Sequence, residues 1–362
     1  MPAAQLIRPI ALGVTLLLGG WLILADPAQP SPAAPPQPSL HQIWPAVQVA
    51  TQTATLDDGT RFTPALYLDP YTAVGVAPSP DGRAQRVLLR TGYETQQLAS
   101  IDADHYPRFT GFTADAGTFF WVEATATTQQ PLSYRLWRAD TRGNPTVLTT
   151  DTGEGVFQGA EHDLVLHDRL LSWAATAGSR TEIRSIPTSG GPVTTTAVDG
   201  SFELSAWPWL QTAAAARQSG RQELLDPATG RRTTVVKSAA ETVDCSPTWC
   251  RSIVAAGTGG DTSYSVLHPD GTARHRVGGA DTFAAVGNVA LLDRFEVVLQ
   301  TGTRSAFDSS HRLSLFDLTT FRLITVADDV DQVQAAGHFL WWSTGDRQRS
   351  TWHALDLAAL TR

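Results

Sequence analysis

The stretch Tyr134-Arg-Leu-Trp-Arg-Ala-Asp-Thr-Arg-Gly-Asn-Pro-Thr-Val-Leu148 carries the pattern that decides the fold. Its side chains from Tyr134 to Ala139 fit an alternation of period two, which is typical of a β-strand. Residues 140–145 supply Asp, Gly, Asn and Pro, which favour turns, and residues 146–149 are again β-branched and apolar. The stretch is therefore predicted to form a β-hairpin.

The same unit recurs along the chain. Residues 118–125 are predicted as a strand before the hairpin, so one unit holds at least three strands in roughly 40 residues, the size of a propeller blade. Equivalent positions in seven units are Leu88, Leu136, Ile183, Leu224, Val266, Leu315 and Ala354. Their separations of 48, 47, 41, 42, 49 and 39 residues are too regular for unrelated hairpins.

The predicted fold is an all-β propeller with seven blades, and six blades stay an alternative count. The early strands of the units are expected at residues 71–74, 118–125, 170–173, 207–210, around Trp249, 289–292 and 339–342. A large antiparallel sandwich is the alternative architecture. A solenoid fits less well, because each unit holds several strands and shows no helical stripe.

The two ends of the repeat region complement each other. Residues 41–69 contain strands without a repeat of their own, whereas the seventh unit ends at Arg362 before a fourth strand. Exposed sheet edges favour aggregation, and propellers leave only short, protected edges. We therefore expect a strand within residues 48–68 to complete the last blade near Trp352.

Composition excludes some functions. The chain of 362 residues is 42% hydrophobic and 17% charged, which permits a sizeable core. Its net charge of −8 and the absence of clustered positive charge argue against a nucleic-acid partner.

The N-terminus is predicted to direct export. Residues 1–25 form a signal-anchor or transmembrane helix, because Arg8 precedes an apolar run of 17 residues, Pro9 to Ala25. Residues 26–40 form a proline-rich linker, and residues 41–362 the propeller domain. The expected location is a single-pass cell-membrane protein with an extracytoplasmic propeller, or a secreted protein if the segment is cleaved. The membrane is thus one expected partner.

Cys245 and Cys250 are the only cysteines of the chain. An exported protein with an even number of cysteines favours an intrachain disulfide. We predict a bridge between them that closes a small turn beside Trp249.

A second set of residues points to a known family. Ser79-Pro-Asp-Gly82, followed by Arg86-Val-Leu-Leu-Arg90, resembles the turn of TolB-like and WD40-like β-propeller repeats, and Cys245-Ser-Pro-Thr-Trp249 is similar to it. The Gly-His and Trp-Asp signatures of WD40 repeats are missing. The resemblance covers about residues 60–362. It implies a propeller with an exported, protein-binding or scaffold role, and it transfers no catalytic residue.

Searches for catalytic motifs find no serine-hydrolase elbow, zinc-peptidase, phosphate-loop or dinucleotide motif. No catalytic residue, metal site or cofactor is predicted. The nearest approach to a metal site is Glu161-His-Asp163 with His167, but a strand there would place His162 and His167 on opposite faces. Asp328, Asp329 and Asp331 lack the Gly and distal Glu of a calcium loop, and a solvated turn is the interpretation.

Five tryptophans occupy equivalent early strands, where packing between blades is favoured over a carbohydrate-binding platform. They are Trp121, Trp173, Trp209, Trp249 and Trp341.

Two function classes follow. The first is an interaction module that binds a protein or cell-envelope partner; its binding residues are unknown from the sequence. The second is a glycosidase-like or lyase-like enzyme whose carboxylates converge on a central channel, a convergence that sequence cannot show.

Overall fold

The computed structural model describes residues 37–126, 132–217, 221–255, 262–301, 311–346 and 349–361. The chain separates into two units, Met1–Gln37 and Pro38–Arg362, and the sheets of the described residues lie in the second. The predicted signal-anchor, residues 1–25, lies outside the described residues. Among those described, no helix combines the length and the apolar character that a membrane span requires.

Four antiparallel sheets of four strands follow the sequence order. The first contains β2 (Thr63–Asp69), β3 (Thr72–Pro78), β4 (Ala84–Thr91) and β5 (Glu94–Asp102). The second contains β6 (Arg108–Asp115), β7 (Thr118–Thr125), β8 (Ser133–Asp140) and β9 (Thr146–Thr149). A later one contains β15 (Phe202–Leu204), β16 (Leu210–Thr212), β17 (Glu223–Leu225) and β18 (Arg232–Thr234). The next contains β19 (Glu241–Cys245), β20 (Cys250–Val254), β21 (Ser263–Leu267) and β22 (His275–Gly278).

A five-stranded sheet follows the sheet of β6–β9 in the sequence, and its first strand is divided into two segments. It contains β10 (Glu154–Gly155), β11 (Val165–His167), β12 (Leu170–Ala177), β13 (Arg180–Pro187) and β14 (Thr194–Asp199). Both β10 and β11 pair with β12. The chain between them therefore leaves the sheet and returns to it.

The last sheet has seven strands. It contains β23 (Thr282–Ala284), β24 (Phe295–Thr301), β25 (His311–Asp317), β26 (Arg322–Ala336), β27 (Phe339–Thr344), β28 (Thr351–Asp356) and β1 (Val49–Thr53). The 15-residue strand β26 pairs with β25 through its first half and with β27 through its second half. It thus belongs to two groups of four strands.

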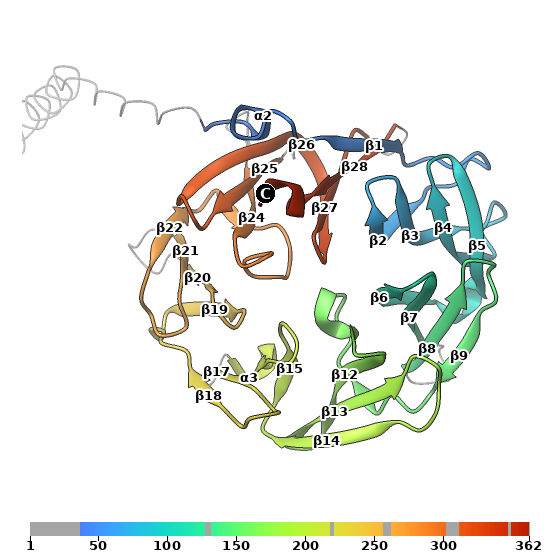
Figure 1. Ribbon diagram of the computed structural model, residues 1–362, viewed down its shortest axis with the longest axis horizontal. Helices are drawn as coiled ribbons and strands as arrows, with labels where there is room; N and C mark the ends of the chain where they lie inside the picture. Colours follow the sequence, from blue (N-terminus) through green and yellow to red (C-terminus); the bar gives the residue numbers. More distant parts are fainter. Residues whose placement is uncertain are drawn as a thin grey trace, which may run out of the picture. The chain divides into compact units, whose positions relative to one another are not determined.

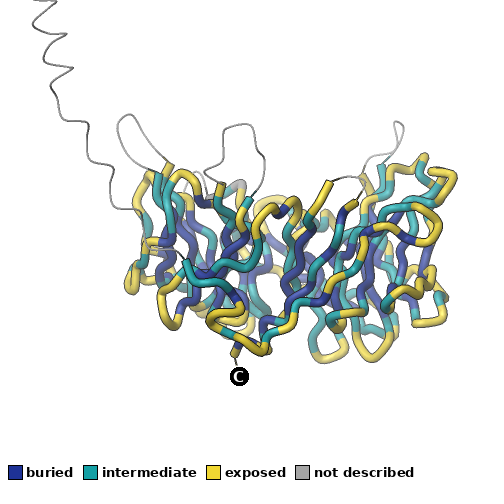
Figure 2. The backbone as a smooth tube through the Cα atoms, turned by 90° about the horizontal axis from the view of Figure 1, so that it is seen from above, coloured by how far each residue is buried: buried dark blue, intermediate teal, exposed yellow. Residues whose placement is uncertain are grey.

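Within the unit Pro38–Arg362, the sheets succeed one another around a common centre (Figure 1). Strands β6 and β19 lie toward this centre, whereas β5, β9, β14, β18 and β22 lie at the periphery. Figure 2 shows buried chain running through the interior of these sheets and exposed chain at their turns. The predicted all-β architecture is confirmed.

The predicted pairing of the N-terminal segment is present, with Val49 opposite Leu355 and Thr53 opposite Thr351. Only part of the expected segment takes part, because residues 63–69 form β2 and pair with β3. The packed unit also starts earlier than the predicted boundary at residue 41. Leu40, in the short helix α2 (Leu40–Ile43), is buried, and Thr325 N donates to the Pro38 carbonyl at 2.9 Å.

The seven equivalent positions all fall on the third strand of a four-strand group and are buried. They are Leu88, Leu136, Ile183, Leu224, Val266, Leu315 and Ala354. The regular spacing in the sequence comes from this third strand, because both faces of its sheet are covered by neighbouring sheets.

The strand predicted at residues 289–292 is wrong. Ala290 and Leu292 have positive φ, and the sixth early strand begins at Phe295. The apolar run is instead a folded loop, with Ala290 and Leu291 buried against the core. Ala290 and Leu291 are buried although their backbone is not extended, so the apolar composition of this loop resembles that of a strand.

Tryptophans fill the space between sheets, as predicted. Trp121, Trp173 and Trp341 are buried in clusters that combine residues of adjacent sheets. Trp209 and Trp249 do not lie on the predicted early strands: they end the turns that precede β16 and β20, and they are only partly buried.

The disulfide between Cys245 and Cys250 is present, and it joins residues that are directly opposite each other on β19 and β20. The turn that it closes is not equivalent to Ser79–Gly82, which connects β3 to β4, the second and third strands of their sheet. In that turn, Ser79 Oγ accepts from Ala84 N at 2.9 Å, and Gly82 has a φ of +71°.

The interpretation of Asp328, Asp329 and Asp331 as a solvated turn is wrong, because their backbone belongs to a strand. All three lie within strand β26, where the pairing register shifts. Asp328 binds Arg312 Nε at 2.7 Å, so this carboxylate serves a cross-strand ion pair.

Candidate functional site

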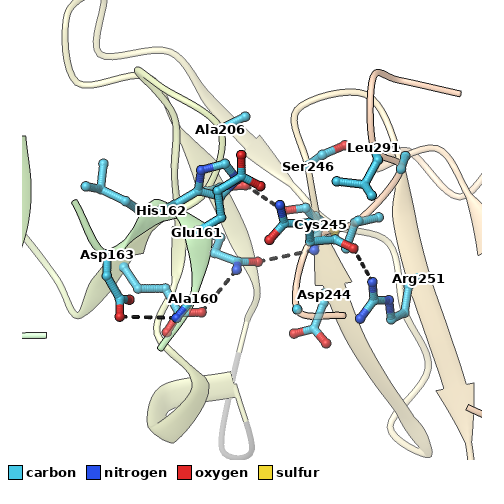
Figure 3. A pocket seen from close by; sticks show the side chains of 18 of the residues that line it. Ala160, Glu161, His162, Asp163, Ala206, Asp244, Cys245, Ser246, Arg251 and Leu291 are labelled. Carbon is cyan, nitrogen blue, oxygen red and sulfur yellow. Dashed lines mark hydrogen bonds between the residues drawn. The ribbon is translucent and has the colours of Figure 1, made fainter. Parts of the chain in front are cut away.

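A cavity of about 410 Å³ lies where loops from several sheets meet, and we call it the acidic cavity. Its wall consists of residues 156–163, the ends of β15 and β19, the loop 287–293, and Gly337. In Figure 3, Ala160 to Asp163 stand opposite Asp244, Cys245 and Arg251. Segments far apart in sequence thus share one wall.

The loop 156–163 is the excursion between β10 and β11, and Asp163 fixes its shape. Asp163 Oδ2 accepts hydrogen bonds from Gly159 N at 2.6 Å and Ala160 N at 3.1 Å, and from Thr110 Oγ1 at 3.3 Å. Burial raises the pKa of Asp163 to about 6, against the opposing effect of these donors. The Asp163 carboxylate therefore holds the loop in its conformation.

Glu161 extends from the same loop to another sheet. Its Oε1 accepts a hydrogen bond at 2.5 Å from the backbone N–H of Gly337, in the turn between β26 and β27. Burial raises the pKa of Glu161 to about 7, and the Gly337 hydrogen bond acts in the opposite direction. Glu161 therefore exchanges a proton near neutral pH.

His162 lies between these two acids in the wall. Burial lowers the pKa of His162 to about 4, so that its imidazole is neutral at pH 7. Among the described residues it has neither a hydrogen-bond partner nor an ion-pair partner. A neutral imidazole offers one donor and one acceptor to a ligand.

Glu203 and Cys245 are linked through one glutamine. Gln211 Nε2 donates to Glu203 Oε1 at 3.0 Å, and Gln211 Oε1 accepts from Cys245 N at 3.2 Å. Ser205 Oγ donates to the Cys245 carbonyl at 2.8 Å. These contacts bind the sheet of β15–β18 to that of β19–β22 and orient the Glu203 carboxylate.

Arg251 is the one arginine in the wall, and its charge is already compensated. Its Nε donates to Glu296 Oε1 at 2.8 Å, and its Nη1 to the Val286 carbonyl at 2.9 Å. Glu296 Oε2 also accepts from Ala290 N at 2.9 Å. A buried, paired guanidinium of this kind holds the loop 286–290 and is not free to bind an anionic ligand.

The cavity wall is rich in acidic residues. It carries Glu161, Asp163, Glu203, Asp244 and Asp293. Such a wall favours cationic groups over phosphates or sulfates.

Glu161–Asp163 and His167, the nearest approach to a metal site in the sequence, do not form a ligand set. Within the described ranges, no three His, Cys, Asp or Glu side chains gather closely enough to hold a metal ion. Residues 161–163 form a short 3₁₀ helix and not a strand. His167 instead stacks on Trp207, with ring centroids 3.8 Å apart.

His167 also takes part in an arrangement that resembles a serine-hydrolase triad. Its Nε2 lies 2.8 Å from Ser172 Oγ, and its Nδ1 lies 3.9 Å from Asp168 Oδ2. However, Ser172 is fully buried in β12 and shares a second hydrogen bond with Ser185. A nucleophile must reach its substrate. The geometry therefore supports structural hydrogen bonds and not acyl transfer.

Sequence reasoning singled out Glu161 and Asp163 but missed Glu203, Asp244 and Gly337. Each missed residue belongs to a different repeat. The available signal is that β15 and β19, both first strands, carry an acid near their ends.

No family model matches the sequence, and no similar curated protein was found. Solved structures do resemble it. TolB from Acinetobacter baumannii has a TM-score of 0.38 and 13% identity, over 90% of this chain and 86% of that one. The β-propeller domain of the Trilobed protease from Pyrococcus furiosus has a TM-score of 0.42 and 8% identity, over 69% and 81%.

A puromycin-hydrolyzing peptidase of Mycobacterium tuberculosis has a TM-score of 0.46 and 15% identity, over 86% of this chain and 52% of that one. This chain thus spans about half the length of that peptidase. TolB and other β-propeller folds are therefore among the structures that the chain resembles. The likeness concerns the fold alone.

Proposed function

We propose that the protein is a membrane-tethered, extracytoplasmic propeller module that binds a protein partner of the cell envelope through the acidic cavity. The observation that carries this proposal is the acidic wall, in which Glu161, Asp163 and Glu203 are each oriented by hydrogen bonds from the protein itself. Prearranged charge of one sign selects and orients a complementary partner.

The proposed architecture is a ring of seven blades. Strand β26 counts in two blades, and β1 supplies the outer strand of the last one, which supports this count. A ring gives every blade two neighbours and brings loops from several blades to one cavity.

The proposed location rests on the N-terminal sequence and the disulfide. Arg8 before the apolar run Pro9 to Ala25 favours export of everything that follows. Disulfides persist in oxidising compartments outside the cytoplasm. Protease added to spheroplasts should digest the domain together with a periplasmic control, and protection of the domain alone would contradict the orientation.

The binding proposal is tested with a photo-crosslinking amino acid at Ala206, which lines the acidic cavity. In native membranes this position should give one partner band, and Glu203→Gln should reduce it severalfold. The control position is Thr195, on the exposed strand β14. Equal products from both positions would contradict a specific cavity.

A second candidate, a propeller enzyme, is favoured by one observation. Glu161, with its pKa near 7, and neutral His162 stand in the same cavity, and perturbed pKa values cluster at catalytic sites. Purified protein incubated with envelope polysaccharide should then release fragments detectable by mass spectrometry. Loss of this release in Glu161→Gln would establish the enzyme, and no release in the wild type would exclude that substrate class.

A further inference from the structure

Strand β14 (Thr194–Asp199) is the outer edge of its sheet and lies at the periphery of the packed unit (Figure 1). Among the described strands it pairs with β13 alone. The side chains of residues 194–197 are exposed one after another, so both faces of the strand are open to solvent there. An edge strand of this kind offers backbone N–H and C=O groups to another extended chain.

This edge lacks the usual protection. Proteins protect an exposed edge with charges, proline, a bulge or a very short strand. Residues 194–198 contain neither a charge nor a proline. All six residues of β14 pair with β13 in one unbroken register, so the strand has no bulge.

The other outer strands of the described sheets differ from β14. Strand β5 carries Glu94 and a register shift, and β9, β18 and β22 have only three or four residues. The long strand β26 has register shifts against both of its neighbours. Strand β1 is regular, but it is shorter than β14 and Ala50 within it is buried. Strand β14 is therefore the longest regular outer edge in the described sheets.

The end of the ladder shows which backbone groups of β14 face outward. Gly200 N donates to the Ser179 carbonyl, in line with the register of β14 and β13. Hydrogen-bonded pairs alternate in an antiparallel ladder, so every second residue before Gly200 directs its backbone groups to β13. The residues between them face outward, and two of these are Thr195 and Ala197. Among the described residues, no group binds their backbone on that side.

Asp199 closes one end of this edge. Its carbonyl accepts from Arg232 Nη2 at 3.4 Å, and its carboxylate forms an ion pair with Arg180 Nε at 2.8 Å. The charge of Asp199 is thus compensated within its own chain. It does not prevent a second strand from approaching residues 194–198.

The edge is complementary to itself. In an antiparallel pair of two copies with Thr196 on the two-fold axis, Thr195 of each copy lies opposite Ala197 of the other. Both residues direct their N–H and C=O groups outward, so each of these two pairs exchanges two hydrogen bonds. Thr194 then lies opposite Val198, a pair of β-branched side chains that favours pairing. Both Asp199 residues stay outside the paired segment.

We propose that β14 is an interaction edge at which two copies of this chain pair antiparallel, with Thr196 of each copy on the two-fold axis. The same edge serves both copies, so the pairing is closed and leaves no edge for a third. Two short strands bury little surface, and the dissociation constant is therefore expected at about 10 to 100 µM. The inference goes beyond the proposed function and does not depend on what the acidic cavity binds.

Sedimentation of the full-length protein in detergent tests the dimer, over concentrations from about 1 to 500 µM. The wild type should change from monomer to dimer across this range. Thr195→Pro removes an outward N–H and no hydrogen bond to β13, and proline is tolerated at such an edge position. This variant should stay monomeric, with a midpoint of thermal unfolding close to that of the wild type.

A charge exchange tests the two-fold axis. Thr196→Lys and Thr196→Glu should each weaken the dimer at least about tenfold, because like charges then lie directly opposite each other. A mixture of the two variants should form the dimer again. The matched control is a mixture of Thr194→Lys and Thr194→Glu, which should show no such recovery, since Thr194 lies opposite Val198.

Cysteine crosslinking tests the dimer in native membranes. In Thr196→Cys the new thiol is the only free one, because Cys245 and Cys250 are joined to each other. Mild oxidation should link two copies of this variant, whereas Glu94→Cys, on the outer strand β5, should stay unlinked. A photo-crosslinker at Thr195 should also give a product of two copies, which differs in mass from a partner band at Ala206.

Three results would overturn the proposal. The first is a wild type that stays monomeric over the whole concentration range. The second is a dimer that Thr195→Pro leaves unchanged, since the contact would then lie elsewhere on the chain. The third is a failure of the Thr196→Lys and Thr196→Glu mixture to recover the dimer, which would exclude the two-fold axis at Thr196.

Discussion

The indole Nε1 of Trp352 donates a hydrogen bond to the carbonyl oxygen of Phe62 over 2.9 Å, although 290 positions separate the two residues. Trp352 lies on β28, and Phe62 precedes β2. Both are buried in one cluster with Tyr67 and Trp341. The last and the first sheets thus share a packed and hydrogen-bonded contact.

Trp352→Phe should lower the free energy of unfolding by about 1 to 3 kcal/mol, because it leaves the buried Phe62 carbonyl without its donor. Trp121→Phe loses similar ring volume but no hydrogen bond, since that indole N–H is unpaired among the described residues. Chemical denaturation of both variants isolates the hydrogen bond. Equal losses would mean that the Trp352 contact adds nothing beyond packing.

Two N-terminal deletions should differ sharply in their effect on the midpoint of thermal unfolding. Deletion of residues 1–37 removes nothing from the packed unit, so the midpoint of thermal unfolding should stay within about 2 °C. Deletion of residues 1–56 removes β1 and the buried Ala50 and Ala54, and exposes the edge of β28. It should lower the midpoint by roughly 10 °C.

Calorimetry of both deletions provides the measurement. Equal midpoints would contradict closure of the ring by β1, and with it the proposed count of seven blades.

Much of the fold could be predicted from the sequence, because each repeat places similar residues in the same structural environment. Leu136 and Leu315 lie on equivalent strands, and both need apolar contact on their side of the sheet. The failures are local. Residues 289–292 have the apolar content of a strand, yet the hydrogen bond from Ala290 N to Glu296 holds them in a loop.

The candidate site was accessible only in part. Glu161 and Asp163 stand out in the sequence as neighbouring polar residues. The cavity that they line also needs Glu203, Asp244 and Gly337, which come from other repeats. A linear pattern cannot show which carboxylates meet at the centre. The partner of Glu161 is moreover a backbone N–H, which has no sequence signature at all.

If the domain is exported as proposed, the disulfide should be complete. Thiol labelling of denatured, unreduced protein should detect no free thiol at Cys245 or Cys250. Two labelled thiols would contradict export into an oxidising compartment. Replacement of both by Ser should cost about 2 kcal/mol, since the closed loop is short, and should leave a cooperative unfolding transition.

Glu161→Gln should change how stability depends on pH. Burial raises the pKa of Glu161 from 4.5 to about 7, so between these values the folded chain binds a proton that the unfolded chain does not. Its contribution to stability is therefore fully present below pH 4.5 and is lost as the pH rises toward 7. Gln stays neutral throughout and can still accept from the Gly337 N–H.

The unfolding midpoint of Glu161→Gln, relative to the wild type, should consequently be higher at pH 8 than at pH 5. His162 acts in the opposite direction, because its lowered pKa adds stability as the pH rises from about 4 to 6.5, and Asp163 acts in the same direction as Glu161 up to about pH 6. Both are present in the two proteins, so the comparison cancels them. Glu94→Gln, at an exposed position, should show no such trend. A difference for Glu161→Gln that is independent of pH would contradict the raised pKa of Glu161.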